Sequence, residues 1–122
     1  MIFETEGANP MQYLLLIYSA ESDDQNQDAA TLMADYGAFT QGIVQSGAFK
    51  SADRLKPVAT ATTVRVRDGK TLTTDGPFAE TREQLGGYYL IEAKDLDEAV
   101  GIAAKVPTAK HGSIEVRPIW SM

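Results

Sequence analysis

Two short apolar runs constrain the fold of this chain more than any other feature. Residues 13–18 read YLLLIY, and residues 87–92 read GYYLIE, where Tyr88 and Tyr89 point to opposite faces of a strand. Both runs are too short for a typical isolated helix, and strands that are apolar on both faces are expected where a sheet is covered on both sides. We therefore predict that these runs form the central pair of strands of one sheet.

Two helices and four further strands are predicted around this pair. Apolar residues recur with helical spacing in residues 28–46, and Asp28 suits the N-cap of that helix. Asp95 and Glu98 resemble a capping box at the start of a second helix, which ends before Pro107. The further strands are predicted at residues 49–55, 62–67, 71–74 and 113–119, with the turn signal Asp68-Gly69 joining the second and third of them into a hairpin.

Each helix is expected to bury one apolar stripe against the sheet. In the first helix this stripe comprises Leu32, Tyr36, Phe39 and Ile43, widened by Met33 and Val44. In the second helix it comprises Leu96, Ala99, Val100 and Ala103. Phe78, the large apolar residue after the hairpin, is expected to anchor that part of the chain in the core.

The order of these elements predicts the fold class. Strand, helix, strand, hairpin, strand, helix and strand form the split β-α-β pattern of α+β, ferredoxin-like proteins, here with an extra hairpin. Two helices can cover only one face of such a sheet, and an apolar face of that size is rarely left in water. We therefore expect a homodimer in which two sheets face each other around a shared interior.

Composition limits the classes of function. The chain has 122 residues, a formal net charge of −6, one histidine and no cysteine. An acidic chain is a poor match for nucleic-acid phosphates or an anionic membrane, and neither partner is expected. The residue types predict no zinc site or other metal, and no cofactor fingerprint is present. We expect one domain, residues 11–122, after a flexible extension of residues 1–10, in a protein without a signal peptide or membrane span that resides in the cytoplasm.

The densest run of special residues is DGPFAETREQLGGYY, residues 75–89. It resembles the signature of the DGPF domain family, which is part of the wider YCII-related group. The resemblance extends over residues 11–119, through Arg54-Leu55, residues 62–69 (TTVRVRDG) and residues 112–118 (GSIEVRP). It implies a dimeric α+β barrel, in agreement with the sheet argument. Members of this family have been described as possible regulators or possible enzymes, and some of their genes lie near those of alternative sigma factors.

The chain departs from the family pattern at two places. Some members of the wider group have a proposed His-Asp pair for acid-base chemistry, with the histidine on the first helix, but residues 28–46 contain no histidine here. That pair is therefore not transferred to this chain. Family members commonly show Gly-Glu-Arg-Leu where this chain has residues 52–55 (ADRL), a change that could alter how closely a ligand approaches.

Asp75 is the carboxylate most suggestive of chemistry. In one interpretation its side chain accepts backbone N–H bonds in an Asx-turn and fixes the corner at Gly76-Pro77. In the other it is a general base at the mouth of a pocket. Arg54 and Arg65 also allow two interpretations, because an arginine on a strand can bind a carboxylate or phosphate, or can pair with an acidic residue across the sheet.

The remaining candidates for ligand binding are Glu80, Glu83, Tyr88, Tyr89 and His111. The two glutamates could anchor a substrate or form only weak local ion pairs. An inward tyrosine hydroxyl could donate a proton or simply find a buried hydrogen-bond partner. The histidine, which titrates near neutral pH, could serve a site or be a loop residue without a role.

These observations favour a small dimeric module that binds an organic ligand in a cleft between the sheet and the hairpin, as an accessory or regulatory protein. The alternative is an enzyme that performs acid-base chemistry on a small aromatic or carboxylate substrate, with Asp75 and Arg54 in its site. A purely structural interaction domain is the third hypothesis. The hypotheses predict different geometry, because only the enzyme needs Asp75, Arg54 and a tyrosine around one pocket.

Overall fold

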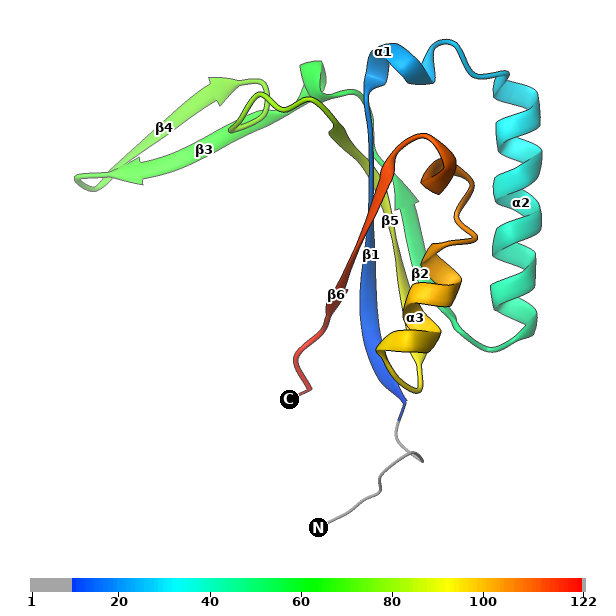
Figure 1. The fold of residues 1–122 in the computed structure, drawn as a ribbon. Coiled ribbons are helices and arrows are strands. Elements are labelled where there is room, and N and C mark those ends of the chain that lie inside the picture. Colours follow the sequence, from blue (N-terminus) through cyan, green and yellow to red (C-terminus); the bar gives the residue numbers. More distant parts are fainter. Residues whose placement is uncertain (1–9, 122) are drawn as a thin grey trace.

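The computed structural model describes residues 10–121 as one mixed α+β fold (Figure 1). The expected extension of residues 1–10 lies outside the described residues except for Pro10. The strands are β1 (Met11–Ser19), β2 (Phe49–Arg54), β3 (Thr62–Arg67), β4 (Lys70–Asp75), β5 (Gln84–Ala93) and β6 (Ser113–Pro118). The helices are α1 (Glu21–Asp24), α2 (Ala29–Gln45) and α3 (Leu96–Ala103), with 3₁₀ turns η2 (Val58–Thr60) and η3 (Pro107–Lys110). No helix in this part of the chain is long and apolar enough to span a membrane.

The main sheet confirms the predicted central strands. Its order is β2-β5-β1-β6, so that the two runs apolar on both faces, β1 and β5, lie in the middle. They pair antiparallel along their whole length, from Met11 opposite Ala93 to Ser19 opposite Gln84. β2 and β6 pair antiparallel at the two edges, an arrangement compatible with a ferredoxin-like fold.

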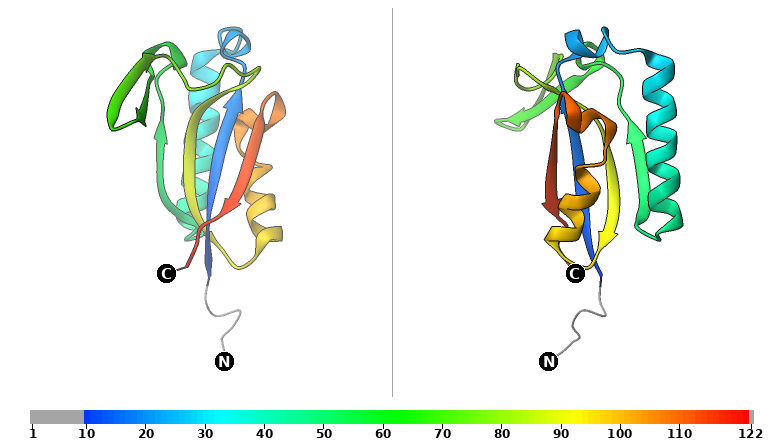
Figure 2. Two further views of the ribbon diagram at one scale, coloured as in Figure 1. Left: turned by 90° about the vertical axis from the view of Figure 1, so that its left-hand side faces the viewer. Right: turned by 45° about the vertical axis from the view of Figure 1, so that its right-hand side comes forward.

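The helices α2 and α3 cover the same face of the sheet, as Figure 2 shows from two directions. Along β1, Tyr13, Leu15 and Ile17 are buried beneath the helices, and their partners Tyr89 and Ile91 on β5 are buried with them. Tyr89 meets the ring of Phe39 edge to face, with ring centroids 5.1 Å apart. This helix-covered face contains the core.

The start of α2 is confirmed, but its apolar stripe is narrower than predicted. The Asp28 carboxylate accepts hydrogen bonds from the Ala30 backbone N–H and from the Thr31 hydroxyl, and the latter bond, more than the former, lowers the pKa of Asp28. Phe39 and Ile43 are buried. Met33 is 69% exposed and Val44 53%, so these two residues do not widen the buried stripe.

The prediction for α3 was also right at the N-terminus and wrong at the edge of the stripe. The Asp95 carboxylate accepts a 2.9 Å bond from the Glu98 N–H, as the capping pattern predicted. Ala99 and Ala103 are buried, but Leu96 and Val100 are 51% and 49% exposed. The helix has only eight residues, and the partly buried Ile102 is its one large residue that packs against the core.

β3 and β4 form a separate two-stranded hairpin, which projects away from the sheet on the side opposite the helices (Figure 1). Its turn is the predicted Asp68-Gly69, with φ of 52° and 74° respectively. Phe78 is 79% exposed, so the expected core anchor is wrong. The reason is spatial: the hairpin leaves the body of the molecule, and the segment after it has no core within reach.

The second face of the main sheet is covered by neither α2 nor α3 (Figure 2, left). We call it the open face. Because side chains alternate along a strand, it carries the residues between the buried ones. Its apolar members, all half-buried, are Leu14, Leu16, Tyr18, Leu85, Tyr88 and Leu90.

Candidate functional site

A pocket of about 440 Å³ lies between α2 and one end of the main sheet. Its position follows from one missing side chain. On the helix-covered face, Arg54, Gly87 and Ile17 form a row across three strands. A Cβ at residue 87 would lie 2.9 Å from the Asp53 carbonyl oxygen, so the close approach of β2 requires glycine there. The same absence leaves space above the strand.

The neighbouring glycine has a different structural role. The register between β1 and β5 shifts after Ile17, which faces Gly87, so that Tyr18 faces Leu85 and Gly86 is left over as a bulge. Its carbonyl accepts a 2.9 Å bond from the Leu55 N–H. The glycine pair thus shapes the strand end and, through Gly87, the floor of the pocket.

Apolar side chains form most of the pocket wall. Leu32, Met33 and Tyr36 reach it from α2, and Ile17, Ala52 and Tyr89 reach it from the sheet. The Tyr89 hydroxyl is held by Thr40 Oγ1 at 2.6 Å, and its ring stacks on Tyr36 with centroids 6.4 Å apart and planes 9° apart. We call this cavity the α2 pocket. A flat hydrophobic ligand is a physical match for such a wall.

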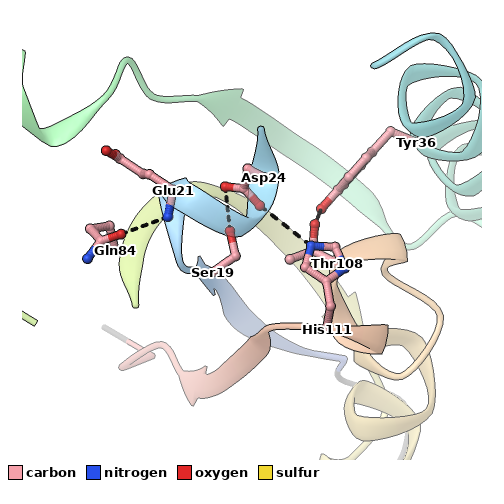
Figure 3. A network of polar contacts seen from close by, with 7 residues as sticks. All are labelled: Ser19, Glu21, Asp24, Tyr36, Gln84, Thr108 and His111. Carbon is pink, nitrogen blue, oxygen red and sulfur yellow. Dashed lines mark hydrogen bonds and ion pairs between the residues drawn. The ribbon is translucent and has the colours of Figure 1, made fainter. Parts of the chain in front are cut away.

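Four polar residues that line the α2 pocket, Ser19, Asp24, Tyr36 and Thr108, belong to one network of contacts, which Figure 3 shows. Asp24, on α1, lines the pocket and accepts a 2.8 Å hydrogen bond from the Ser19 hydroxyl at Oδ2. His111 Nε2 lies 3.5 Å from the other oxygen, Oδ1. That nitrogen is buried and makes no hydrogen bond within residues 10–121. The carboxylate is therefore oriented from two sides.

The short helix that carries Asp24 is tied to its neighbours. The Glu21 N–H donates to Gln84 Oε1 at 2.9 Å, and Glu21 Oε2 accepts from the Val58 N–H at 2.9 Å. One glutamate thus joins α1 to β5 and to η2. Four residues would not hold a helix in water, and these bonds fix the position of the Asp24 carboxylate.

Tyr36 supplies a second polar group of this network. Its hydroxyl forms a 2.6 Å hydrogen bond with Thr108 Oγ1, a buried residue of η3. Burial is the main cause that raises the pKa of Tyr36 above its ordinary value, and the nearby Tyr89 and Asp24 act in the same direction. The hydroxyl therefore stays protonated at neutral pH and remains a donor or acceptor.

Arg54 is the cation of the α2 pocket. It lies at the end of β2 and points to the same face as Gly87, its pairing partner. Within the described residues it forms no salt bridge. Glu92 pairs with Lys50, and Glu115 pairs with Arg117. These two acidic residues of the sheet are therefore engaged with other cations.

The structure divides the predicted site residues into two groups. Arg54, Tyr88 and Tyr89 line the α2 pocket, and His111 contacts the Asp24 carboxylate. Asp75, Arg65 and Glu80 are exposed and line neither this pocket nor the larger hollow between α2 and α3. Glu83 accepts a 2.8 Å bond from the Ser113 hydroxyl. The pocket lies between the sheet and α2, and not between the sheet and the hairpin as expected.

Asp75 has neither of the two predicted roles in this geometry. Its side chain makes no hydrogen bond within the described residues, and it lies at the base of the projecting hairpin, paired with Thr62. The corner after it is held instead by Gly76, whose N–H donates to the Ala61 carbonyl at 2.7 Å and whose carbonyl accepts from the Thr63 hydroxyl at 2.9 Å. Gly76 has φ of 98°, which suits glycine.

Sequence reasoning missed Ser19, Asp24, Tyr36 and Thr108 as site residues. Asp24 lies in the acidic segment of residues 19–28, from which no site residue was predicted, and Tyr36 was assigned to the core stripe. A signal was available for Tyr36, because a tyrosine in an apolar stripe needs a partner for its hydroxyl. The partner, Thr108, lies far away in the chain and could not be found from spacing.

A larger and shallower hollow of about 890 Å³ lies between α2 and α3. Its floor includes Phe39 and Ile43, and its edge carries Lys94, Lys105 and Lys110. These lysines come from three separate places, and the two glutamates of the hollow are engaged, Glu92 with Lys50 and Glu98 with the Lys94 N–H. The α2 pocket is the better candidate because different functional groups converge there.

The comparisons with known proteins cover most of the chain, but neither of the two matches below names a ligand. A family model described as the YCII-related domain matches residues 11–122. An uncharacterised protein of Rhizobium meliloti (strain 1021) is 40% identical over 114 residues, which cover 89% of this chain and 92% of that protein.

Proposed function

On the premise that this chain belongs to the YCII-related domain family, we propose that it is a small ligand-binding module that takes a flat organic anion into the α2 pocket. The observation that carries the proposal is the meeting of an apolar, tyrosine-rich wall with Arg54, a cation without a salt bridge within residues 10–121, in a space of about 440 Å³. A cavity of that volume suits a small aromatic or aliphatic carboxylate. The accessory or regulatory role expected from the sequence belongs to this proposal.

Arg54 gives the pocket its preference for anions. A guanidinium binds a carboxylate with two parallel hydrogen bonds, and hydrogen bonds to charged groups are worth about 1.5–3 kcal/mol each. Asp24, which also lines the pocket, accepts a hydrogen bond from Ser19 and is contacted by His111, and it would repel a carboxylate placed beside it. The ligand is therefore oriented with its charge at Arg54 and its ring along Tyr36.

A binding experiment with two matched probes tests this proposal. Benzoate and benzyl alcohol have the same ring, but only benzoate has a charge for Arg54. In NMR titrations of the full chain we expect benzoate to shift resonances of the pocket, and Arg54→Gln to weaken its binding about tenfold. Benzyl alcohol should bind both proteins equally. Arg65→Gln, on the exposed hairpin, is the control and should behave as the unmodified chain.

Two results contradict the proposal. If benzoate and benzyl alcohol bind equally well to all three proteins, Arg54 is not the anchor. If neither probe shifts resonances of the pocket at millimolar concentration, the cavity is not a site for small aromatic ligands.

A second candidate function, acid-base catalysis, is favoured by the oriented Asp24 carboxylate beside the Tyr36 hydroxyl. A carboxylate held from two sides can take a proton from a bound substrate, and a neutral tyrosine can donate one. Phenylpyruvate, an aromatic 2-oxo acid, is a suitable probe because its enol-to-keto conversion requires such transfers. Acceleration that is lost in Asp24→Asn and kept in Asp23→Asn would support catalysis, whereas equal rates in all proteins would leave only binding.

We further propose that the chain belongs to the DGPF subgroup and forms a dimeric barrel. The subgroup is supported by residues 75–89, which carry the motif over its full length. The dimer is supported by the open face, where Leu14, Leu16 and Leu90 form an apolar surface that the helices do not cover. A second copy packed against this face would remove it from water.

A further inference from the structure

The β3–β4 hairpin, residues 62–75, lies outside the hydrophobic core of the described residues. We call it the arm. All six residues of β4 and five of the six residues of β3 are exposed. An isolated two-stranded hairpin is only marginally stable in water, and two strands normally need a third strand or a packed face. The arm is therefore a structural element that is mostly exposed and packs little against the rest of residues 10–121.

The two faces of the arm differ in chemistry. Opposite residues in an antiparallel pair share a face, so Val64 and Val66 lie with their partners Thr73 and Thr71. The other face carries Arg65, paired with Leu72, and further cations near the turn. The valines are 59% and 58% exposed. This face is thus a β-branched strip whose one charged residue, Asp75, lies at its base opposite Thr62, and the strip is suited to packing against another apolar surface.

Position connects the arm to the open face. Figure 1 shows the arm leaving the end of the main sheet on the side opposite the helices, which is the side of the open face. A second copy that covers the open face would lie next to the arm. The apolar strip would then continue the apolar surface of the sheet.

The charge of the arm favours its local contact with the body of a second copy. The arm carries three cations, Arg65, Arg67 and Lys70, and two carboxylates, Asp68 and Asp75, so that it has a net charge of +1. The whole chain has a net charge of −6, and the remainder therefore has −7. A basic arm attracts the acidic body of another copy, and this attraction adds to apolar burial.

We propose that the arm is an intermolecular clasp, whose Val64 and Val66 face packs against a second copy of this chain in a homodimer. This inference rests on the proposed dimer through the open face. The clasp explains three features of the arm: its exposed valines, its position outside the core and its direction.

Site-specific cross-linking tests the clasp directly, because the chain contains no cysteine. Val66→Cys, labelled with a benzophenone maleimide and illuminated, should give a covalent product of twice 13.2 kDa. Arg65→Cys, on the opposite face of the same strand, is the matched control and should give little of it. Equal yields from both positions, or no covalent dimer from Val66→Cys, would overturn the inference.

A second variant separates the clasp from the dimer itself. Val64→Thr with Val66→Thr keeps the β-branched shape of both side chains but replaces two methyl groups with hydroxyls. We expect the dimer dissociation constant to rise at least about tenfold by sedimentation velocity. If the unmodified chain is a dimer and this variant dissociates identically, the clasp is wrong and the dimer stands. If the unmodified chain is a monomer at micromolar concentration, the dimer fails and the clasp with it.

Discussion

Gly112 lies where no side chain fits. A Cβ at this position would be 2.2 Å from the Tyr18 carbonyl oxygen and 3.0 Å from Thr108 Cγ2, and the first of these atoms is backbone that cannot move cheaply. Its N–H also donates a 2.7 Å bond to the Thr108 carbonyl, which places the chain between η3 and β6. The constraint is steric, since the glycine brings two segments next to the pocket into contact.

We predict that Gly112→Ala lowers the free energy of unfolding by about 2–4 kcal/mol, measured by urea denaturation. Gly101→Ala is the matched control, because Gly101 lies within α3 and a Cβ there meets nothing within 4 Å. Alanine favours helix over glycine, so the control should be more stable by about 0.5–1 kcal/mol. Similar small effects in both variants would show that the Gly112 backbone can adjust.

Tyr36 should make the stability of the fold depend on alkaline pH. Its pKa is raised in the folded state, mainly by burial, so the folded chain holds this proton more tightly than the unfolded chain. The contribution of Tyr36 is fully present below the unfolded pKa, about 10, and is lost as pH rises through the folded pKa. Stability therefore falls with increasing pH in this range.

Tyr36→Phe tests this dependence through urea denaturation between pH 9 and pH 11.5. The variant should lose less free energy of unfolding over that interval than the unmodified chain. It will be less stable near pH 8, because Thr108 Oγ1 loses its partner in a buried position. Parallel pH profiles for the two proteins would argue against Tyr36 as the source.

The strands were predictable because their patterns depend on local chemistry. Residues 87–92 read as a buried strand from apolar side chains at successive positions, and β5 contains them at the centre of the sheet. Asp28 and Asp95 were predictable as N-caps for the same reason, since the bond that each carboxylate accepts lies within three residues.

The depth of burial was not predictable from periodicity. Met33 and Val100 lie at the edges of correct helical stripes, yet both are largely exposed. A spacing pattern shows which way a side chain points but not where the sheet ends or how far the two helices diverge. The prediction that Phe78 lies in the core was wrong for a related reason. The junctions of the hairpin, and not its composition, set the direction of the arm.

The site was only half predictable. Arg54 and Tyr89 were found from residue type and strand position. Asp24 and His111 come from segments far apart in the chain, and only the folded sheet brings Oδ1 and Nε2 to 3.5 Å. The motif that includes Asp75 serves mainly the junction between arm and sheet. Its glycines shape the α2 pocket, while its carboxylate stays outside.

As a whole, the molecule has a core on one side of its sheet and an apolar surface on the other. Leu16 lies at the centre of the open face, paired with Tyr88 on one side and Glu115 on the other. If two copies associate through this face, Leu16 of each becomes buried. A charge introduced there would then have to be desolvated without a partner, which is costly.

We predict that Leu16→Glu raises the dimer dissociation constant about a hundredfold or more, so that sedimentation velocity at micromolar concentration shows mainly the 13.2 kDa species. Val100→Glu, on the exposed side of α3, introduces the same charge away from the open face and should leave the dimer intact. Circular dichroism would check that both variants keep their secondary structure. An unmodified chain that sediments as a monomer, or a folded Leu16→Glu variant that remains dimeric, would place the apolar surface outside any interface between copies.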